Sequence, residues 1–167
     1  MGGDVKEDDM YKLNRGTRLA KNFTLAEFAC PGSDVIEVDY RLVEKLQRMR
    51  DVISFIRGKD TAITIMSGYR TQAYNKKIGG ADGSQHMYGK AADIHVEGLN
   101  PFEVYPYAVY VGFTGIGVYS PPEDSGSWIH VDVRPASARW GKYKQAKELD
   151  SETVYKIKIK DLKEMIT

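Results

Sequence analysis

Residues 84–96 place a histidine, an aspartate and a second histidine among small residues, just before an apolar, β-branched run. His86 and Asp93 are seven residues apart, with Gly89 between them, and His95 follows. Imidazole nitrogen and carboxylate oxygen are ligand types that zinc takes in catalytic sites, which keep one position open for water. We therefore expect His86 and Asp93 to hold such an ion, together with a ligand from later in the chain.

Residues 128–134 alternate with a period of two, which is typical of a half-buried strand. Side chains alternate across a strand, so Trp128, His130, Asp132 and Arg134 share one face. We expect His130 to meet the first two ligands from that face, and Asp132 to point into the same cleft. His95 lies two residues beyond Asp93 on one strand face, either orienting a ligand or filling an ordinary surface or core position.

The elements around these residues predict an α+β fold. The clearest helix covers residues 40–57, with Asp39 as N-cap and Gly58 after its end. Short β-rich runs separated by glycine-rich turns predict a small antiparallel sheet that carries the metal site and is flanked by helices. We divide the chain into a loose arm (1–16), one catalytic domain (17–140) and a C-terminal extension of uncertain role (141–167), with a strand expected at 154–159.

Composition excludes several classes of protein. The 167 residues contain 24 Lys and Arg against 23 Asp and Glu, so we expect no nucleic-acid partner. Cys30 is the sole cysteine, which excludes an intrachain disulfide and a cysteine-rich zinc site, and we expect it to be a small buried residue. No run approaches the roughly 20 apolar residues of a membrane span. The acidic start does not resemble a signal peptide.

The motif Ser84-x-His86-x-x-Gly89-x-Ala91-x-Asp93 follows Ser67-Gly68-Tyr69-Arg70 and precedes His130-Val131-Asp132. In this order the three motifs resemble the zinc peptidases of the M15 family. The resemblance covers about residues 20–140, including the 23–28 opening and Ala138-Arg139-Trp140. That family contains D-alanyl-D-alanine carboxypeptidases and phage L-alanyl-D-glutamate endopeptidases, and its wider fold group includes the hedgehog signalling domain.

The resemblance implies one Zn²⁺ per chain, bound by His86, Asp93 and His130, with water in the fourth position. It also implies that Arg70 contacts substrate or transition state, although the arginine could instead pair with a surface acid. A planar, permanently charged guanidinium suits a carboxylate or an oxyanion. Three further substrate-binding candidates accompany it, each with a plain turn or core role as the alternative: Ser84, Tyr88 and Trp128.

The position where the family pattern has its general base carries a different residue in this chain. Many relatives have a glutamate three residues before the last histidine, where this chain has Ser127. A serine without an adjacent base cannot accept the proton of a metal-bound water. Our ranking is Asp132, then Asp124, then Glu123, judged by expected hydrogen-bond reach of that water. Asp132 has an equally supported alternative role, which is to hold His130 or Arg134 in place.

These observations predict a zinc-dependent peptidoglycan peptidase acting on wall stem peptides, as a D-Ala-D-Ala carboxypeptidase or an L-Ala-D-Glu type endopeptidase. We expect a monomer without membrane insertion, which acts on the wall either after phage-type release from the cytoplasm or as a trimmed extracellular form. A zinc-retaining binding or signalling domain without turnover is the second hypothesis, and a metal-free wall-anchoring module is the third.

Overall fold

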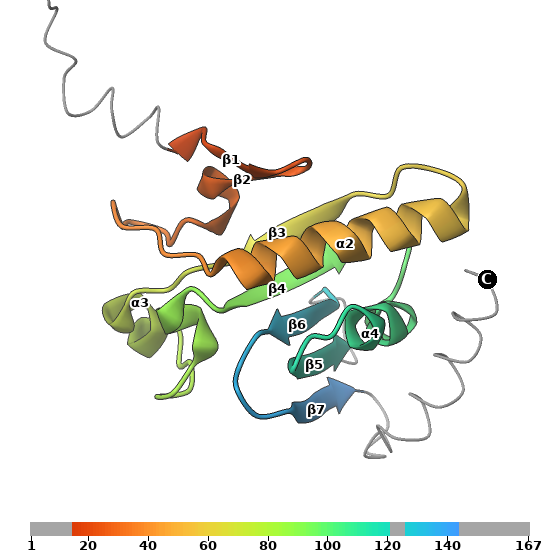
Figure 1. The fold of residues 1–167 in the computed structure, drawn as a ribbon. Coiled ribbons are helices and arrows are strands. Elements are labelled where there is room, and N and C mark those ends of the chain that lie inside the picture. Colours follow the sequence, from red (N-terminus) through yellow and green to blue (C-terminus); the bar gives the residue numbers. More distant parts are fainter. Residues whose placement is uncertain (1–14, 121–125, 144–167) are drawn as a thin grey trace, which may run out of the picture.

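The computed structural model describes residues 15–120 and 126–143. A five-stranded sheet forms its centre, in the order β3-β4-β6-β5-β7 (Figure 1). Its strands are β3 (Ile63–Ser67), β4 (Ala91–Val96), β5 (Gly115–Ser120), β6 (Trp128–Asp132) and β7 (Ala138–Tyr143). The α+β prediction is confirmed. The first four strands in this order pair antiparallel as expected, whereas β7 lies parallel to β5, and this strand runs past the predicted domain boundary at residue 140.

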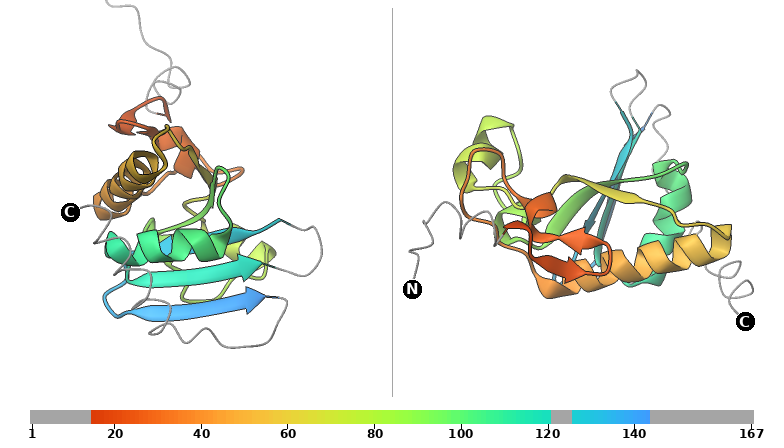
Figure 2. Two further views of the ribbon diagram at one scale, coloured as in Figure 1. Left: turned by 90° about the vertical axis from the view of Figure 1, so that its right-hand side faces the viewer. Right: turned by 90° about the horizontal axis from the view of Figure 1, so that it is seen from above.

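Two helices supply most of the core beside the sheet. Helix α2 (Tyr40–Arg57) begins after Asp39, whose side chain accepts from the Arg41 amide, and ends at Gly58 in the left-handed conformation, as the sequence predicts. Helix α4 (Pro101–Tyr110) is capped by Asn100 and contacts β5 and β6. The left view of Figure 2 shows α4 lying alongside β5. The buried apolar residues of α2 are Leu42, Val43, Leu46, Met49 and Ile53.

Alternation of side chains along β4 and β6 places core residues on one face of the sheet and candidate site residues on the other. Ile94 in β4 and Ile129 and Val131 in β6 are fully or almost fully buried members of the hydrophobic core. The residues between them point to the opposite face of the sheet, because successive side chains of a strand alternate. That face receives Asp93 and His130, which are direct cross-strand partners.

The N-terminal segment holds the loop that leads to the site. Strands β1 (Arg18–Ala20) and β2 (Phe23–Thr24) precede a 3₁₀ turn, η1 (Leu25–Phe28), which begins with a capping box of Thr24 and Glu27. The carbonyl of Phe28 accepts the Tyr69 amide at 2.8 Å, which ties this segment to the end of β3. Helix α3 (Gln72–Lys77) and a second 3₁₀ turn, η2 (Gln85–Tyr88), follow.

Several expectations fall outside the described residues, namely most of the 1–16 arm, the strand at 154–159 and most of the C-terminal extension. Among the residues described, no helix is long and apolar enough to cross a membrane.

Gly89 is the position where backbone conformation and space together demand glycine. Its φ is +63°, and an added Cβ would meet the carbonyl of Glu37. We expect Gly89→Ala to destabilise the protein by clearly more than the ~1–2 kcal/mol of a left-handed alanine, because the 37–38 backbone must also move. Urea unfolding of the metal-free protein measures this change.

Gly58→Ala is the matched control, because Gly58 has a φ of +66° with open space around its Cβ position. Equal losses of stability in the two variants would show that the contact with Glu37 carries no cost.

Candidate metal centre

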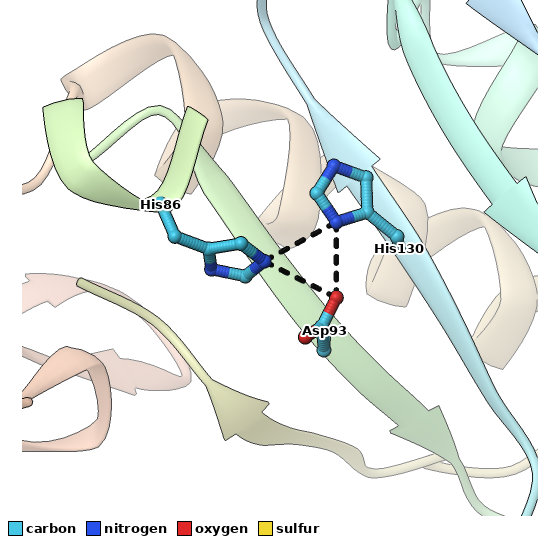
Figure 3. Close-up of side chains that lie close together, drawn as sticks. All are labelled: His86, Asp93 and His130. Atoms are coloured by element: carbon cyan, nitrogen blue, oxygen red, sulfur yellow. Dashed lines mark hydrogen bonds and ion pairs between the residues drawn. The ribbon is translucent and has the colours of Figure 1, made fainter. Parts of the chain in front are cut away.

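Three side chains from different elements converge on one point (Figure 3). His86 comes from η2, Asp93 from β4 and His130 from β6. The Nε2 atom of His86 lies 3.2 Å from Nδ1 of His130 and 3.3 Å from Oδ1 of Asp93, and the latter two atoms are 3.0 Å apart. This is also the one group of metal-ligand type found within the described ranges.

In each imidazole, one nitrogen (the inner one) faces the other converging atoms, and the second (the outer one) faces a hydrogen-bond acceptor. Nδ1 of His86 is 2.7 Å from the Gly68 carbonyl oxygen, and Nε2 of His130 is 2.9 Å from Oδ2 of Asp132. A carbonyl or an ionised carboxylate can only accept, so each outer nitrogen carries the hydrogen. When both rings are neutral, their inner nitrogens therefore present lone pairs to each other and to the Asp93 carboxylate.

This donor set fits a zinc ion. Three acceptors that face one another at about 3 Å repel unless a cation lies between them. Metal–ligand distances of about 2.0–2.1 Å in a tetrahedral site place its donors about 3.3 Å apart, close to the observed spacing. Both histidines are buried, at 2% and 7% exposure, so water does little to relieve the repulsion.

Arg70 lies at the other side of the Asp93 carboxylate. Its Nη2 donates to Asp93 Oδ2 at 2.6 Å, and its Nε donates to the Ser67 hydroxyl at 2.9 Å. The Arg70 amide also donates to the His86 carbonyl at 3.0 Å. The arginine thus occupies one carboxylate oxygen and leaves Oδ1 directed at the two imidazoles.

Comparison with known proteins agrees with this geometry. The sequence model of the family described as peptidase M15 matches residues 21–132, which is well over half of the chain. The chain belongs to the peptidase M15 family. The match begins in the N-terminal segment and includes all three converging side chains of this M15 chain.

Individual relatives carry related names. A zinc D-Ala-D-Ala carboxypeptidase of Streptomyces albus G is 44% identical over 104 residues, which are 56% of this chain and 39% of that protein. A probable peptidoglycan L,D-endopeptidase MepK of Haemophilus influenzae is 26% identical over 140 residues, covering 74% of this chain and 73% of the relative. The peptidoglycan L,D-endopeptidase MepK of Escherichia coli K12 is 27% identical over 104 residues, which are 59% of this chain and 53% of that protein. The alignments thus span from about two fifths to about three quarters of these relatives.

Asp132 of this M15 chain is fully buried and engaged on several sides. Besides accepting from His130, it accepts from the Arg134 amide at 3.1 Å and from the Arg134 guanidinium. It lies at the outer nitrogen of His130, across the imidazole ring from the point where the three ligand atoms meet. The alternative role predicted for Asp132 is to hold His130 or Arg134 in place, and the Asp132 carboxylate contacts both residues.

The remaining sequence candidates are scattered. Ser84 is the residue before η2, the Tyr88 side chain is 56% exposed, and His95 is exposed at the surface. Trp128 stacks on Tyr119, with ring centroids 4.7 Å apart and planes 6° from parallel. The other two candidate bases, Glu123 and Asp124, lie outside the described residues.

Two contacts of the centre escaped the sequence analysis. The Gly68 carbonyl that orients His86 is a backbone group, so no residue type in the sequence indicates its role. Trp140, from β7, packs against the His130 ring with centroids 5.1 Å apart. Its strand is parallel to β5 and follows a connection without clear alternation, so neither pairing nor register was evident beforehand.

Two ligands have displaced pKa values in the metal-free chain. Burial raises the pKa of Asp93, but the His130 and His86 rings outweigh this effect and hold that pKa well below its usual range. Burial lowers the pKa of His130, but hydrogen bonding to Asp132 and Asp93 outweighs it and raises the pKa above 6.5. In the metal-free chain, His130 Nδ1 therefore keeps a proton to higher pH than an ordinary imidazole does.

Zinc and this proton compete for one nitrogen, so we expect zinc to stabilise the fold more at high pH. The raised pKa of His130 stabilises the metal-free protein below its unfolded value of 6.5, and this contribution is lost as the pH rises through the folded value. The lowered pKa of Asp93 acts oppositely, adding stability above 3.8 that is lost at lower pH. Thermal unfolding with zinc and with chelator, between about pH 5.5 and 8, measures the difference.

His86→Ala is the control for this prediction, because it removes one of the three converging side chains while Asp93 and His130 both remain in the chain. It should abolish the zinc-induced rise in melting temperature at every pH. A zinc effect of equal size across the range in the unmodified protein would contradict competition for His130.

Proposed function

We propose that this chain is a zinc-dependent peptidoglycan peptidase, which hydrolyses a peptide bond in wall stem peptides. The observation that carries the proposal is the convergence of three lone-pair donors, from His86, Asp93 and His130, in a member of the peptidase M15 family. The names of its relatives supply the substrate class, since they include a D-Ala-D-Ala carboxypeptidase and peptidoglycan L,D-endopeptidases. We assign His86, Asp93 and His130 as the zinc ligands.

Zinc, when bound, supplies Lewis-acid chemistry, lowering the pKa of a coordinated water and polarising the scissile carbonyl. The chain itself contributes orientation and charge. Arg70 uses Nε and Nη2 for Ser67 and Asp93, and we assign its Nη1 to a substrate carboxylate or to the oxyanion of the transition state. A permanently charged group 13% exposed beside the ligands suits that task.

Substrate enters, in this proposal, along the open face of the sheet. A groove of about 460 Å³ is lined by residues of β4, β6 and the start of α4, among them His95, Trp128 and Pro101, and none of the three zinc ligands lines it. Trp128 is two residues from His130 on the same strand face, so a peptide held at the zinc ligands reaches the groove. Ser84 and Tyr88 flank His86 and belong to the other end of the site.

We assign Asp132 to positioning rather than to proton transfer, because its oxygens are occupied by His130 and Arg134. The general base then comes from Asp124 or Glu123, in the segment that precedes β6. The protein acts at the cell wall as a monomer, and its nearly balanced charge gives it no preference for nucleic acid.

A zinc-retaining binding domain without turnover is the second candidate function. It is favoured by Ser127, which stands where many relatives have a glutamate, and by the burial of Asp132. Within the described residues, no further carboxylate joins the three-ligand group.

Digestion of purified muropeptides followed by mass analysis tests the leading proposal. We expect loss of a terminal D-alanine or internal cleavage of the stem peptide, with activity removed by chelator and restored by zinc. His86→Ala should lower the rate by about 10³-fold or more, because the metal supplies several kcal/mol of transition-state stabilisation. A zinc-loaded chain that cleaves no wall peptide would reject the enzyme in favour of the binding domain.

Separate measurements of zinc affinity and kcat distinguish positioning from proton transfer. Asp132→Asn keeps the side-chain shape but loses the charge that orients His130, so we expect zinc affinity to fall about 10- to 100-fold. Replacing the base, by Asp124→Asn or Glu123→Gln, should lower kcat by about 10²- to 10⁴-fold at unchanged zinc affinity. If Asp132→Asn shows this second pattern, Asp132 is the base.

A further inference from the structure

Contacts to the metal centre continue beyond residue 132, where the family match ends. The Arg134 side chain donates from Nε to both carboxylate oxygens of Asp132 at 2.9 Å and from Nη2 to Oδ2. Asp132 in turn accepts from the outer nitrogen of His130. Arg134 therefore fixes the orientation of the Asp132 carboxylate, and this carboxylate in turn fixes the orientation of His130.

Trp140 reaches the same ligand from β7. Its indole ring packs on the His130 ring at a centroid distance of 5.1 Å, and the Arg134 guanidinium carbon lies 4.8 Å from the indole centroid. The indole Nε1 donates to the Tyr119 hydroxyl at 2.6 Å, which fixes the orientation of the indole ring. Trp140 thus touches both His130 and the arginine that holds Asp132.

Strand β5 leaves space for this arrangement. Gly115 is the cross-strand partner of Asp132, and Gly117 is the partner of both His130 and Trp140. A Cβ at Gly115 would overlap the Asp132 carboxylate, and one at Gly117 would overlap the Trp140 indole. The alternating glycines of β5 are therefore matched to the side chains that lie over them.

We propose that Arg134 and Trp140 are positioning residues of the metal centre, which hold the His130 imidazole through Asp132 at its Nε2 atom and through the tilted contact of the indole with its ring. The inference rests on the zinc ligands assigned under the proposed function. Rotation of the imidazole about its Cβ–Cγ bond moves Nδ1 away from the other two ligand atoms. The carboxylate and the indole oppose that rotation from different directions.

The chemistry of both residues suits this role. A guanidinium presents its donors as a rigid fork that matches a carboxylate, whereas a lysine ammonium is a point charge on a flexible stem. The same planar cation also packs on an indole face. Arg134→Lys therefore keeps the charge and loses both geometric constraints.

Zinc affinity by chelator competition and the visible spectrum of the Co²⁺-substituted protein test the proposal without requiring turnover. We expect Arg134→Met and Trp140→Ala to weaken zinc binding about 10- to 100-fold. Arg134→Lys, Trp140→Phe and Tyr119→Phe should give smaller losses of affinity. In all five variants the Co²⁺ absorption bands should shift, because the position of the His130 ligand changes.

Arg48→Met is the matched control, because Arg48 on α2 lies over the Tyr110 ring, with its guanidinium carbon 5.8 Å from the centroid. It removes an arginine–aromatic contact from a helix and should leave zinc affinity and the Co²⁺ spectrum unchanged. Urea unfolding of each metal-free variant separates a general loss of stability from a specific loss of binding.

Folded variants with unchanged zinc affinity and Co²⁺ spectra would overturn the proposal, as would affinity losses that merely follow the loss of metal-free stability. Tyr119→Phe removes a single oxygen and keeps the ring, so it decides the question if the larger changes prevent folding. An unmodified chain that binds zinc but cleaves no muropeptide would reject the proposed function and leave this inference intact. One that binds no zinc would reject the metal centre itself.

Discussion

The centre of this protein depends on holding three electron-pair donors against their mutual repulsion. Two neutral imidazole nitrogens and a carboxylate oxygen face one another at 3.0–3.3 Å in a largely buried setting. Such an arrangement persists only when each donor is held from behind and a positive charge lies between them. The Gly68 carbonyl, Asp132 and Arg70 are those supports, one for each of the three donor side chains.

The supports differ in how firmly the fold determines them. Asp93 and His130 are paired across β4 and β6, so sheet register alone brings them together. His86 lies in a 3₁₀ turn and needs several backbone contacts. Its carbonyl accepts from the Arg70 amide, and its ring donates to the carbonyl of Gly68. The segment that holds His86 is itself tied to Phe28 through the Tyr69 amide, so the N-terminal turn contributes to metal geometry from a distance.

Much of the site could be predicted from sequence because it is encoded by short-range patterns. Alternation in a strand puts His130, Asp132 and Arg134 on one face, and a turn followed by an apolar run brings Asp93 to the start of β4. The parts that escaped prediction depend on long-range geometry. Nothing local shows that Gly68 offers its carbonyl, or that β7 returns parallel to β5 with Trp140 over Gly117. The imidazole nitrogen that Asp132 contacts was likewise not evident from the sequence.

The charges at the centre are arranged as two matched pairs. Asp93 is paired with Arg70, and Asp132 with Arg134, so these four groups sum to zero while the imidazoles are neutral. Neither carboxylate therefore presents its full charge to the point where the ligands meet. Even so, hydrogen bonds and charge from Asp132 and Asp93 outweigh burial and raise the pKa of His130. A divalent ion held at the same point would therefore enter a nearly neutral environment, where little fixed charge of the chain opposes its own.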